Sequence, residues 1–123
     1  NCKLHYITSL VFVLKTISIG VFFILIKEAL DGAEAIVMTV PTFAIRNVAV
    51  EANKLLTKKV HIITGAKGFE LKTHKRMSEV LRESFDEDKR YEIVSLIGPS
   101  HAEEVVKGCV TLITATSVIS VIT

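Results

Sequence analysis

The chain has 123 residues, of which 50% are hydrophobic and 23% are charged. This is the size of one ordinary domain with enough apolar side chains to form a core, and the composition excludes a disordered protein. Lys and Arg number 15 against 13 Asp and Glu, and this near balance gives no electrostatic reason to expect a nucleic acid or an acidic surface as partner.

The first predicted element is the apolar stretch over residues 7–26, ITSLVFVLKTISIGVFFILI. About 20 residues could span a membrane, but Lys15 near the middle would cost about 2.5 to 3.5 kcal/mol in a bilayer. Two buried strands, or a strand and a helix, are the favoured alternative. Because the chain starts at Asn1 without an initiator Met, we expect a piece of a longer protein, in which residues 1–26 form an apolar N-terminal segment of uncertain status.

From residue 27 onward, predicted strands and helices alternate. Continuous apolar runs of strand length occur at residues 35–40, 59–65, 91–97 and 109–115. Apolar residues at spacings of three and four predict amphipathic helices over 45–56 and 77–85, and a short helix is expected from about residue 101. Strands that are apolar on both faces and alternate with helices predict an α/β fold with a mostly parallel sheet covered by helices.

The turn Gly98-Pro99-Ser100 follows the third predicted strand. Ligands of open parallel sheets collect beyond the carboxyl ends of the strands, where loops and helix N-termini converge. Ser100 and Glu103 have the S-x-x-E spacing of a capping box, which predicts a helix that begins at Ser100. The free amides of such a helix start favour an anion such as phosphate. A turn without a ligand is the alternative.

Lys67 stands between Gly65 and Gly68 at the end of the second predicted strand. This position is suited to presenting an ammonium group to a ligand in the same crevice as the Gly98 turn, although a solvated loop lysine is the alternative. The segment lacks the spacing of a P-loop, and no G-x-G-x-x-G occurs. Cys2 and Cys109 lie far apart, and no histidine has a partner at metal-ligand spacing, so we expect no disulfide, no metal site and a reducing cytoplasm.

Four sequence blocks follow one another with characteristic spacing: EALDGAEAIVMTVPTFAIR (28–46), ITGAKGFE (63–70), MSEVL (77–81) and IGPSHAEEVVKG (97–108). Together they resemble the N-terminal domain of NAD-dependent glycerol-3-phosphate dehydrogenase, over residues 27 to about 118. The resemblance implies an incomplete Rossmann-like fold, with residues 27–123 as a partial dinucleotide-binding domain. It also implies a two-domain enzyme that interconverts dihydroxyacetone phosphate and glycerol 3-phosphate by hydride transfer with NAD or NADP.

The resemblance assigns roles to single residues by position. The residues assigned to the substrate are Lys67, Gly98 and Ser100, and those assigned to the cofactor are Pro41, Thr42, Lys67 and Ala102. No catalytic residue is assigned in this chain. The lysine that the family uses as general acid and base belongs to a C-terminal domain, and the glycine fingerprint for the pyrophosphate belongs upstream.

Three hypotheses about function follow from these patterns. The first is a fragment of the dehydrogenase that is inactive alone, located in the cytoplasm, without nucleic acid or membrane as partner. The second is a stand-alone module that binds a phosphorylated ligand at the Gly98 turn. The third is a small membrane-anchored protein in which residues 7–26 span the bilayer. The oligomeric state, including a homodimer of the full-length protein, and the choice between NAD and NADP are left open.

Overall fold

The computed structural model describes residues 4–6, 26–99 and 101–117. These residues contain a five-stranded sheet in which each strand lies beside the next one along the chain. The strands are β1 (Leu4–Tyr6), β2 (Ala35–Met38), β3 (Val60–Thr64), β4 (Arg90–Ile97) and β5 (Thr114–Ser117). Strands β1 to β4 run parallel, and β5 runs antiparallel to β4. The prediction of an α/β fold with a mostly parallel sheet is therefore confirmed.

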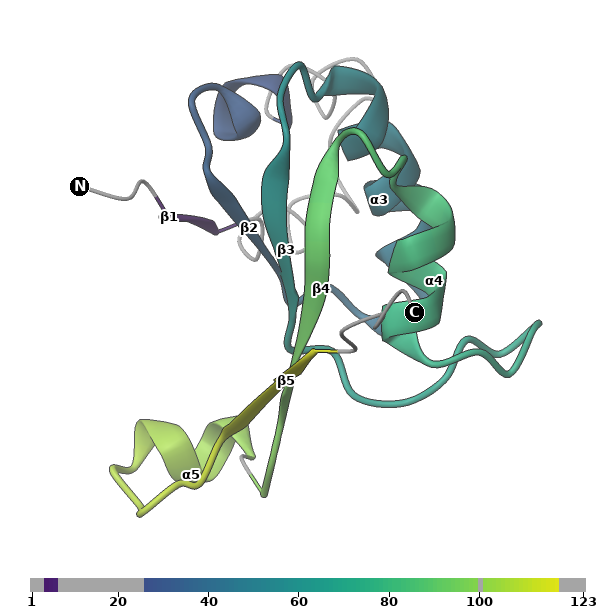
Figure 1. Ribbon diagram of the computed structural model, residues 1–123. Coiled ribbons are helices and arrows are strands. Elements are labelled where there is room, and N and C mark those ends of the chain that lie inside the picture. The colour runs from purple at the N-terminus through teal and green to yellow at the C-terminus, as the bar shows by residue number, and fades with distance from the viewer. Residues whose placement is uncertain (1–3, 7–25, 100, 118–123) are drawn as a thin grey trace, which may run out of the picture.

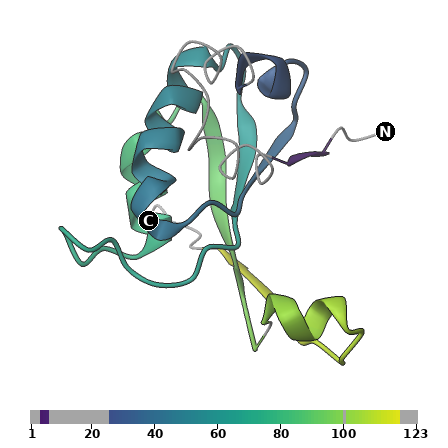
Figure 2. The same ribbon diagram turned by 180° about the vertical axis from the view of Figure 1, so that it is seen from behind.

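Two helices connect the parallel strands. Helix α3 (Thr42–Leu55) joins β2 to β3, and α4 (Met77–Ser84) joins β3 to β4. They lie side by side on one face of the sheet (Figures 1 and 2). Residues 26–30 form a further helical turn before β2, and α5 (Ala102–Val106) lies in the connection from β4 to β5. Both amphipathic helices occur where the apolar periodicity predicts them, within a few residues at each end.

The hydrophobic core lies between the sheet and the two covering helices. All four residues of β2 are buried, as expected for an inner parallel strand, while β3 alternates between buried and more exposed positions. Among the largest fully buried side chains are Ile36, Met38, Ile45, Ile62, Leu81 and Phe85. Burial of each such side chain contributes roughly 1.5 to 3 kcal/mol. This packing fixes the carboxyl ends of β2, β3 and β4 relative to one another.

The last predicted strand is wrong over residues 109–113. The observed strand β5 begins only at Thr114, which pairs with Ile97, the last residue of β4. Residues before Thr114 therefore extend beyond the end of β4 and have no strand to pair with. The apolar run predicted burial there, yet the side chains of Val110 and Leu112 are 97% and 72% exposed.

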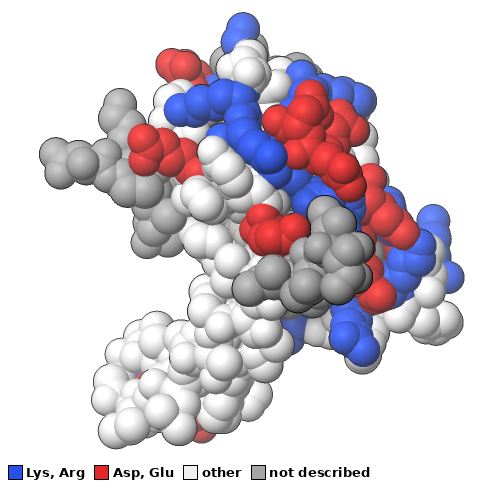
Figure 3. All heavy atoms as spheres, viewed as in Figure 1, with Lys and Arg blue, Asp and Glu red and all other residues white. Residues whose placement is uncertain are grey.

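The segment from the end of β4 through α5 to β5 forms an arm that projects from the body of the domain (Figure 1). On the face in view it carries almost no charged side chain (Figure 3). In contrast, acidic and basic side chains interleave over the side where α3 and α4 lie (Figures 1 and 3). The exposed apolar side chains of the arm are Ile97, Val105, Val106, Val110, Leu112 and Ile113.

The apolar stretch over residues 7–26 lies outside the described residues, apart from Ile26, which is fully buried. Its assignment to buried elements or to a membrane span stays a prediction. In the part of the chain that the structure describes, no helix has the length and the apolar character needed to cross a membrane.

Candidate functional site

Two segments singled out in the sequence meet at the carboxyl ends of β3 and β4. The Nζ atom of Lys67 donates a hydrogen bond of 2.8 Å to the carbonyl oxygen of Gly98. Lys67 follows β3, and Gly98 follows β4, so the parallel pairing of these two strands brings the residues together across 31 positions of sequence. The expectation that the lysine and the glycine turn share one crevice is met by this contact. Ser100 lies outside the described residues.

Lys67 lies in a segment that we call the lysine loop, residues 65–76. At the start of the loop, the Gly65 amide donates to the Met38 carbonyl oxygen of β2 at 3.0 Å. The Ala66 amide donates to Thr64 Oγ1 of β3 at 3.3 Å. Gly68 has φ +114°, a backbone conformation that side chains disfavour. A Cβ at Gly68 would lie 3.6 Å from Thr42 Cγ2, so the loop passes directly over the start of α3.

The turn at Gly98 needs glycine for a steric reason. The chain returning from α5 passes so close that a Cβ at Gly98 would lie 2.1 Å from the Leu112 carbonyl oxygen and 3.3 Å from Ile113 Cα. Both neighbours are backbone atoms, which cannot rotate away as a flexible side chain would. The close approach therefore explains the glycine.

The Lys67–Gly98 contact lies at the wall of a cleft of about 500 Å³. The cleft is formed by the ends of β3 and β4, the start of α4 and the last residues of β5. Among the described residues that line it, none is acidic, the basic ones are Lys67, Arg76 and Arg82, and those with hydroxyl groups are Thr64, Ser78, Ser95, Thr116 and Ser117. Cationic donors without a competing carboxylate suit an anionic ligand such as a phosphoester.

Besides Lys67, the residues assigned to the cofactor lie at two helix starts. Pro41 is the exposed N-cap of α3, and Thr42 is its first residue, adjacent to Gly68 of the lysine loop. The first turn of this helix contains no acidic side chain, so nothing there neutralises the positive end of the helix dipole. Ala102 is the first residue of α5. Thr42 thus lies beside the lysine loop, whereas Ala102 lies on the arm.

The predicted start of α5 differs from the observed one. The N-cap is His101 and the helix begins at Ala102, rather than at Ser100 as the capping-box spacing predicts. The helix is only five residues long, so its dipole is smaller than that of a full-length helix. A capping contact of the predicted kind occurs at α4 instead, where the Arg76 amide donates to Glu79 Oε2 at 2.8 Å.

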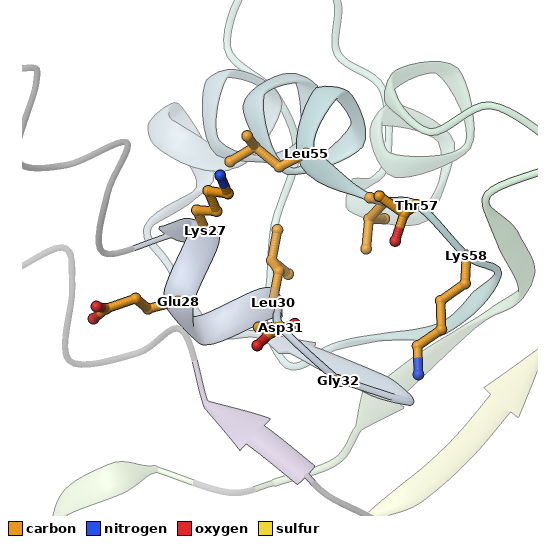
Figure 4. A pocket seen from close by; sticks show the side chains of 9 residues that line it. Lys27, Glu28, Leu30, Asp31, Gly32, Leu55, Thr57 and Lys58 are labelled. Carbon is orange, nitrogen blue, oxygen red and sulfur yellow. The ribbon is translucent and has the colours of Figure 1, made fainter.

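A second hollow lies at the opposite ends of the strands (Figure 4). It has a volume of about 340 Å³ and lies between the residues that precede β2 and those that follow α3, with Lys27, Asp31 and Lys58 at its wall. Ligands of parallel α/β sheets gather at the carboxyl ends rather than at the amino ends of the strands. The cleft at Lys67 is therefore the candidate site.

An ion-pair network that the sequence does not reveal holds the middle of the lysine loop. Arg46 of α3 contacts Glu70 through two hydrogen bonds of 2.7 Å, from Nε and Nη2. The Arg46 guanidinium, helped by the Thr73 hydroxyl, lowers the pKa of Glu70 from 4.5 to about 2, and the same contact raises the pKa of Arg46. Both residues occur in the sequence blocks quoted above, but periodicity predicts only a solvated face for Arg46.

The shifted pKa of Glu70 predicts a pH dependence of stability. Since the folded chain binds the proton less readily than the unfolded chain, the contribution of Glu70 is complete above about pH 4.5 and is lost as the pH falls toward 2. We expect Glu70→Gln to lower the urea midpoint at pH 6, with a difference from wild type that shrinks between pH 4.5 and 2. The control is Glu103→Gln, which alters an exposed carboxylate outside the described ion pairs. A Glu70→Gln difference that is unchanged at pH 2 would contradict this assignment.

The parallel strands, the two covering helices and the cleft at the carboxyl ends define a Rossmann-like α/β domain. A sequence model described as the N-terminus of NAD-dependent glycerol-3-phosphate dehydrogenase matches residues 23–120. The chain therefore belongs to the NAD-dependent glycerol-3-phosphate dehydrogenase family, as the sequence blocks indicate.

Two curated relatives are named glycerol-3-phosphate dehydrogenase, NAD(P)+. The protein from Ligilactobacillus salivarius is 52% identical over 93 residues, which are 73% of this chain and 28% of the relative. The protein from an Exiguobacterium species is 51% identical over 80 residues, 65% of this chain and 24% of the relative. The chain thus spans about a quarter of the length of these relatives.

A solved structure supports the same assignment. The crystal structure of glycerol-3-phosphate dehydrogenase from Coxiella burnetii superposes with a TM-score of 0.64 at 28% sequence identity. The superposition covers 76% of this chain and 28% of that protein. The match extends the family assignment from the sequence to the arrangement of strands and helices.

Proposed function

We propose that this chain is the N-terminal, cofactor-binding part of a glycerol-3-phosphate dehydrogenase that uses NAD or NADP and acts in the cytoplasm. The observation that carries the proposal is the contact between Lys67 and Gly98, at a cleft whose described lining is basic and not acidic. The names of the relatives support glycerol 3-phosphate as a ligand, and the family resemblance implies dihydroxyacetone phosphate as the second one. The near balance of charge over the whole chain supports a small phosphoester rather than a nucleic acid.

In this proposal, Lys67, Gly98 and Ser100 hold the substrate phosphate. The ammonium group of Lys67 supplies positive charge and donors that can turn from the Gly98 carbonyl to a phosphate oxygen. Gly98 lets the backbone come close to the ligand because it has no side chain. These residues would orient the substrate and would not transfer a proton.

The residues proposed for the cofactor are Pro41, Thr42, Lys67 and Ala102. The start of α3 fits a negatively charged dinucleotide, since its first turn is free of acidic side chains and lies beside the lysine loop. When bound, the nicotinamide would exchange a hydride with the substrate carbon. We propose that the chain is inactive alone, because no G-x-G-x-x-G occurs in the sequence and the family resemblance assigns the general acid and base lysine to a C-terminal domain.

A chimera tests the function in a complete enzyme. Residues 27–118 replace the matching segment of the Ligilactobacillus salivarius dehydrogenase, and reduction of dihydroxyacetone phosphate is followed by the loss of nicotinamide absorbance. We expect the chimera to be active and the isolated 123 residues to be inactive. Lys67→Met in the chimera should lower kcat/KM by about 10- to 100-fold, because a hydrogen bond from a charged donor is lost.

The matched control is Lys72→Met, which removes an exposed lysine from the same loop. It should change kcat/KM by less than about twofold, because surface substitutions away from the site have small effects. Thermal unfolding shows whether each variant is folded. A folded chimera without activity would contradict the proposal, and glycerol 3-phosphate binding by the isolated chain would then favour a stand-alone module.

A further inference from the structure

The contact between Arg46 and Glu70 differs from an ordinary surface ion pair. The guanidinium meets both carboxylate oxygens at 2.7 Å and reaches Glu83 Oε2 of α4 at 3.1 Å. The side chain of Glu70 is only 14% exposed, and it also accepts a hydrogen bond of 2.5 Å from Thr73 Oγ1. Bidentate geometry and partial burial make such a pair stronger and more directional than an exposed one. Arg46 thus ties α3, the lysine loop and α4 together.

The lysine loop has little apolar contact that could hold it in place. Phe69 and Leu71, its large apolar side chains, are 61% and 80% exposed. Within the loop, the Glu70 amide donates to the Lys75 carbonyl oxygen at 2.9 Å, and the His74 amide donates to the Glu70 carbonyl oxygen at 2.8 Å. These bonds close residues 70–75 on themselves without attaching them to the domain. The Arg46 contact supplies that attachment, together with an ion pair between Lys75 and Glu83.

Lys67 lies between the two points at which the loop is attached. Upstream, the Gly65 amide is bonded to β2, and downstream, Glu70 is held by Arg46 three residues after the lysine. Gly68 between them has φ +114° and adds conformational freedom. If the Arg46 contact is lost, the next downstream attachment is the ion pair between Lys75 and Glu83, eight residues after Lys67, so the backbone of Lys67 is held less tightly.

We propose that Arg46 and Glu70 are a positioning pair, which holds the lysine loop so that the ammonium group of Lys67 meets the substrate phosphate at the Gly98 turn. The inference rests on the proposed function, because the effect of the pair passes through Lys67. The pair itself does not touch the substrate. Its removal should therefore weaken substrate binding while the chemistry of the bound complex continues.

The kinetic test uses the chimera described above with Glu70→Gln, which keeps the size of the side chain and removes its charge. We expect KM for dihydroxyacetone phosphate to rise about tenfold with kcat changed less than about twofold, as for a lost binding interaction. Arg46→Lys keeps the charge without the bidentate geometry and should give a smaller increase. In a Lys67→Met background, Glu70→Gln should add less than about a twofold change, since the two residues act through one path.

The control for ion pairs in general is Lys54→Met. It removes the Lys54–Glu51 pair of 2.8 Å on the same helix as Arg46, and it does not touch the lysine loop. We expect its KM to stay within about twofold of the unmodified chimera. An equal KM increase in this control, or an undiminished effect of Glu70→Gln in the Lys67→Met background, would overturn the inference.

Hydrogen exchange on the 123-residue chain measures how firmly the loop is held, and it does not require enzyme activity. The amides of Glu70 and His74 should exchange at least about tenfold faster in Glu70→Gln than in the wild-type chain. Unchanged exchange and an unchanged KM, with Lys67→Met still defective, would overturn the positioning role and leave the proposed function intact. Full activity of the Lys67→Met chimera would instead refute the proposed function. It would also refute the positioning role, because Arg46 and Glu70 are proposed to act through Lys67.

Discussion

Gly98→Ala is expected to separate the turn after β4 from the segment that returns from α5. The new Cβ would lie 2.1 Å from the Leu112 carbonyl oxygen, a distance at which the backbone has to move. Overpacking of this kind costs about 1 to 3 kcal/mol, and more when no side chain can yield. We expect urea unfolding to show a loss of about 3 kcal/mol, and the paired amides of β4 and β5 to exchange faster.

Gly32→Ala is the matched control for this substitution. Gly32 also has a positive φ, +69°, but a Cβ there would meet no atom within 4 Å. Gly32→Ala should lower the free energy of unfolding by only about 1 kcal/mol, because alanine, unlike glycine, is strained in a left-handed backbone conformation. Equal losses for the two variants would show that backbone conformation, rather than the contact with Leu112, explains the glycine at position 98.

Phe85→Ala is expected to be the most damaging change in the core. The ring is 2% exposed and follows α4, where the Phe85 carbonyl oxygen also accepts a hydrogen bond of 3.2 Å from Arg90 Nε. Truncation of a buried phenylalanine lowers the free energy of unfolding by about 3 to 5 kcal/mol. The total free energy of unfolding of an ordinary domain is only about 5 to 15 kcal/mol. The variant should therefore unfold at a much lower urea concentration, or fail to fold at 37 °C.

Phe69→Ala provides the comparison for Phe85, with the same change at an exposed site. Its ring is 61% exposed on the lysine loop, so the free energy of unfolding should change by no more than about 0.5 kcal/mol. Similar urea midpoints for the two variants would mean that the ring of Phe85 does not contribute to the core as described.

The three inner strands β2 to β4 and the two covering helices could be predicted because each has a local pattern. The run at 35–38 is buried along its whole length, and the residues Ile45, Val48, Ala49 and Ala52 that give α3 its period are all buried. Such patterns reflect one-sided or two-sided burial, which depends mainly on the residues of the element itself. The turns after the second and third predicted strands singled out Lys67 and Gly98, and these two residues are in contact.

The same reasoning failed where the outcome depended on distant neighbours. The run at 109–113 is as apolar as a buried strand, but its pairing partner β4 ends at Ile97, so only residues from Thr114 join the sheet. The helix start near Ser100 was displaced to Ala102. Arg46 lies away from the apolar face of its helix, and periodicity does not show that Glu70, 24 residues away in sequence, contacts it.

Local patterns in the sequence are enough to predict the α/β class, the alternation of strands and helices from residue 27 onward, and the family. These properties follow from hydrophobic periodicity and from short blocks whose residues are near one another along the chain. Three features require the folded chain: the hydrogen bond from Lys67 to the Gly98 carbonyl oxygen, the contact of Arg46 with the lysine loop, and the start of the last strand at Thr114, near the end of its apolar run. Each of these depends on which distant segments the packed sheet brings within a few ångströms, and that distance is a property of the whole fold.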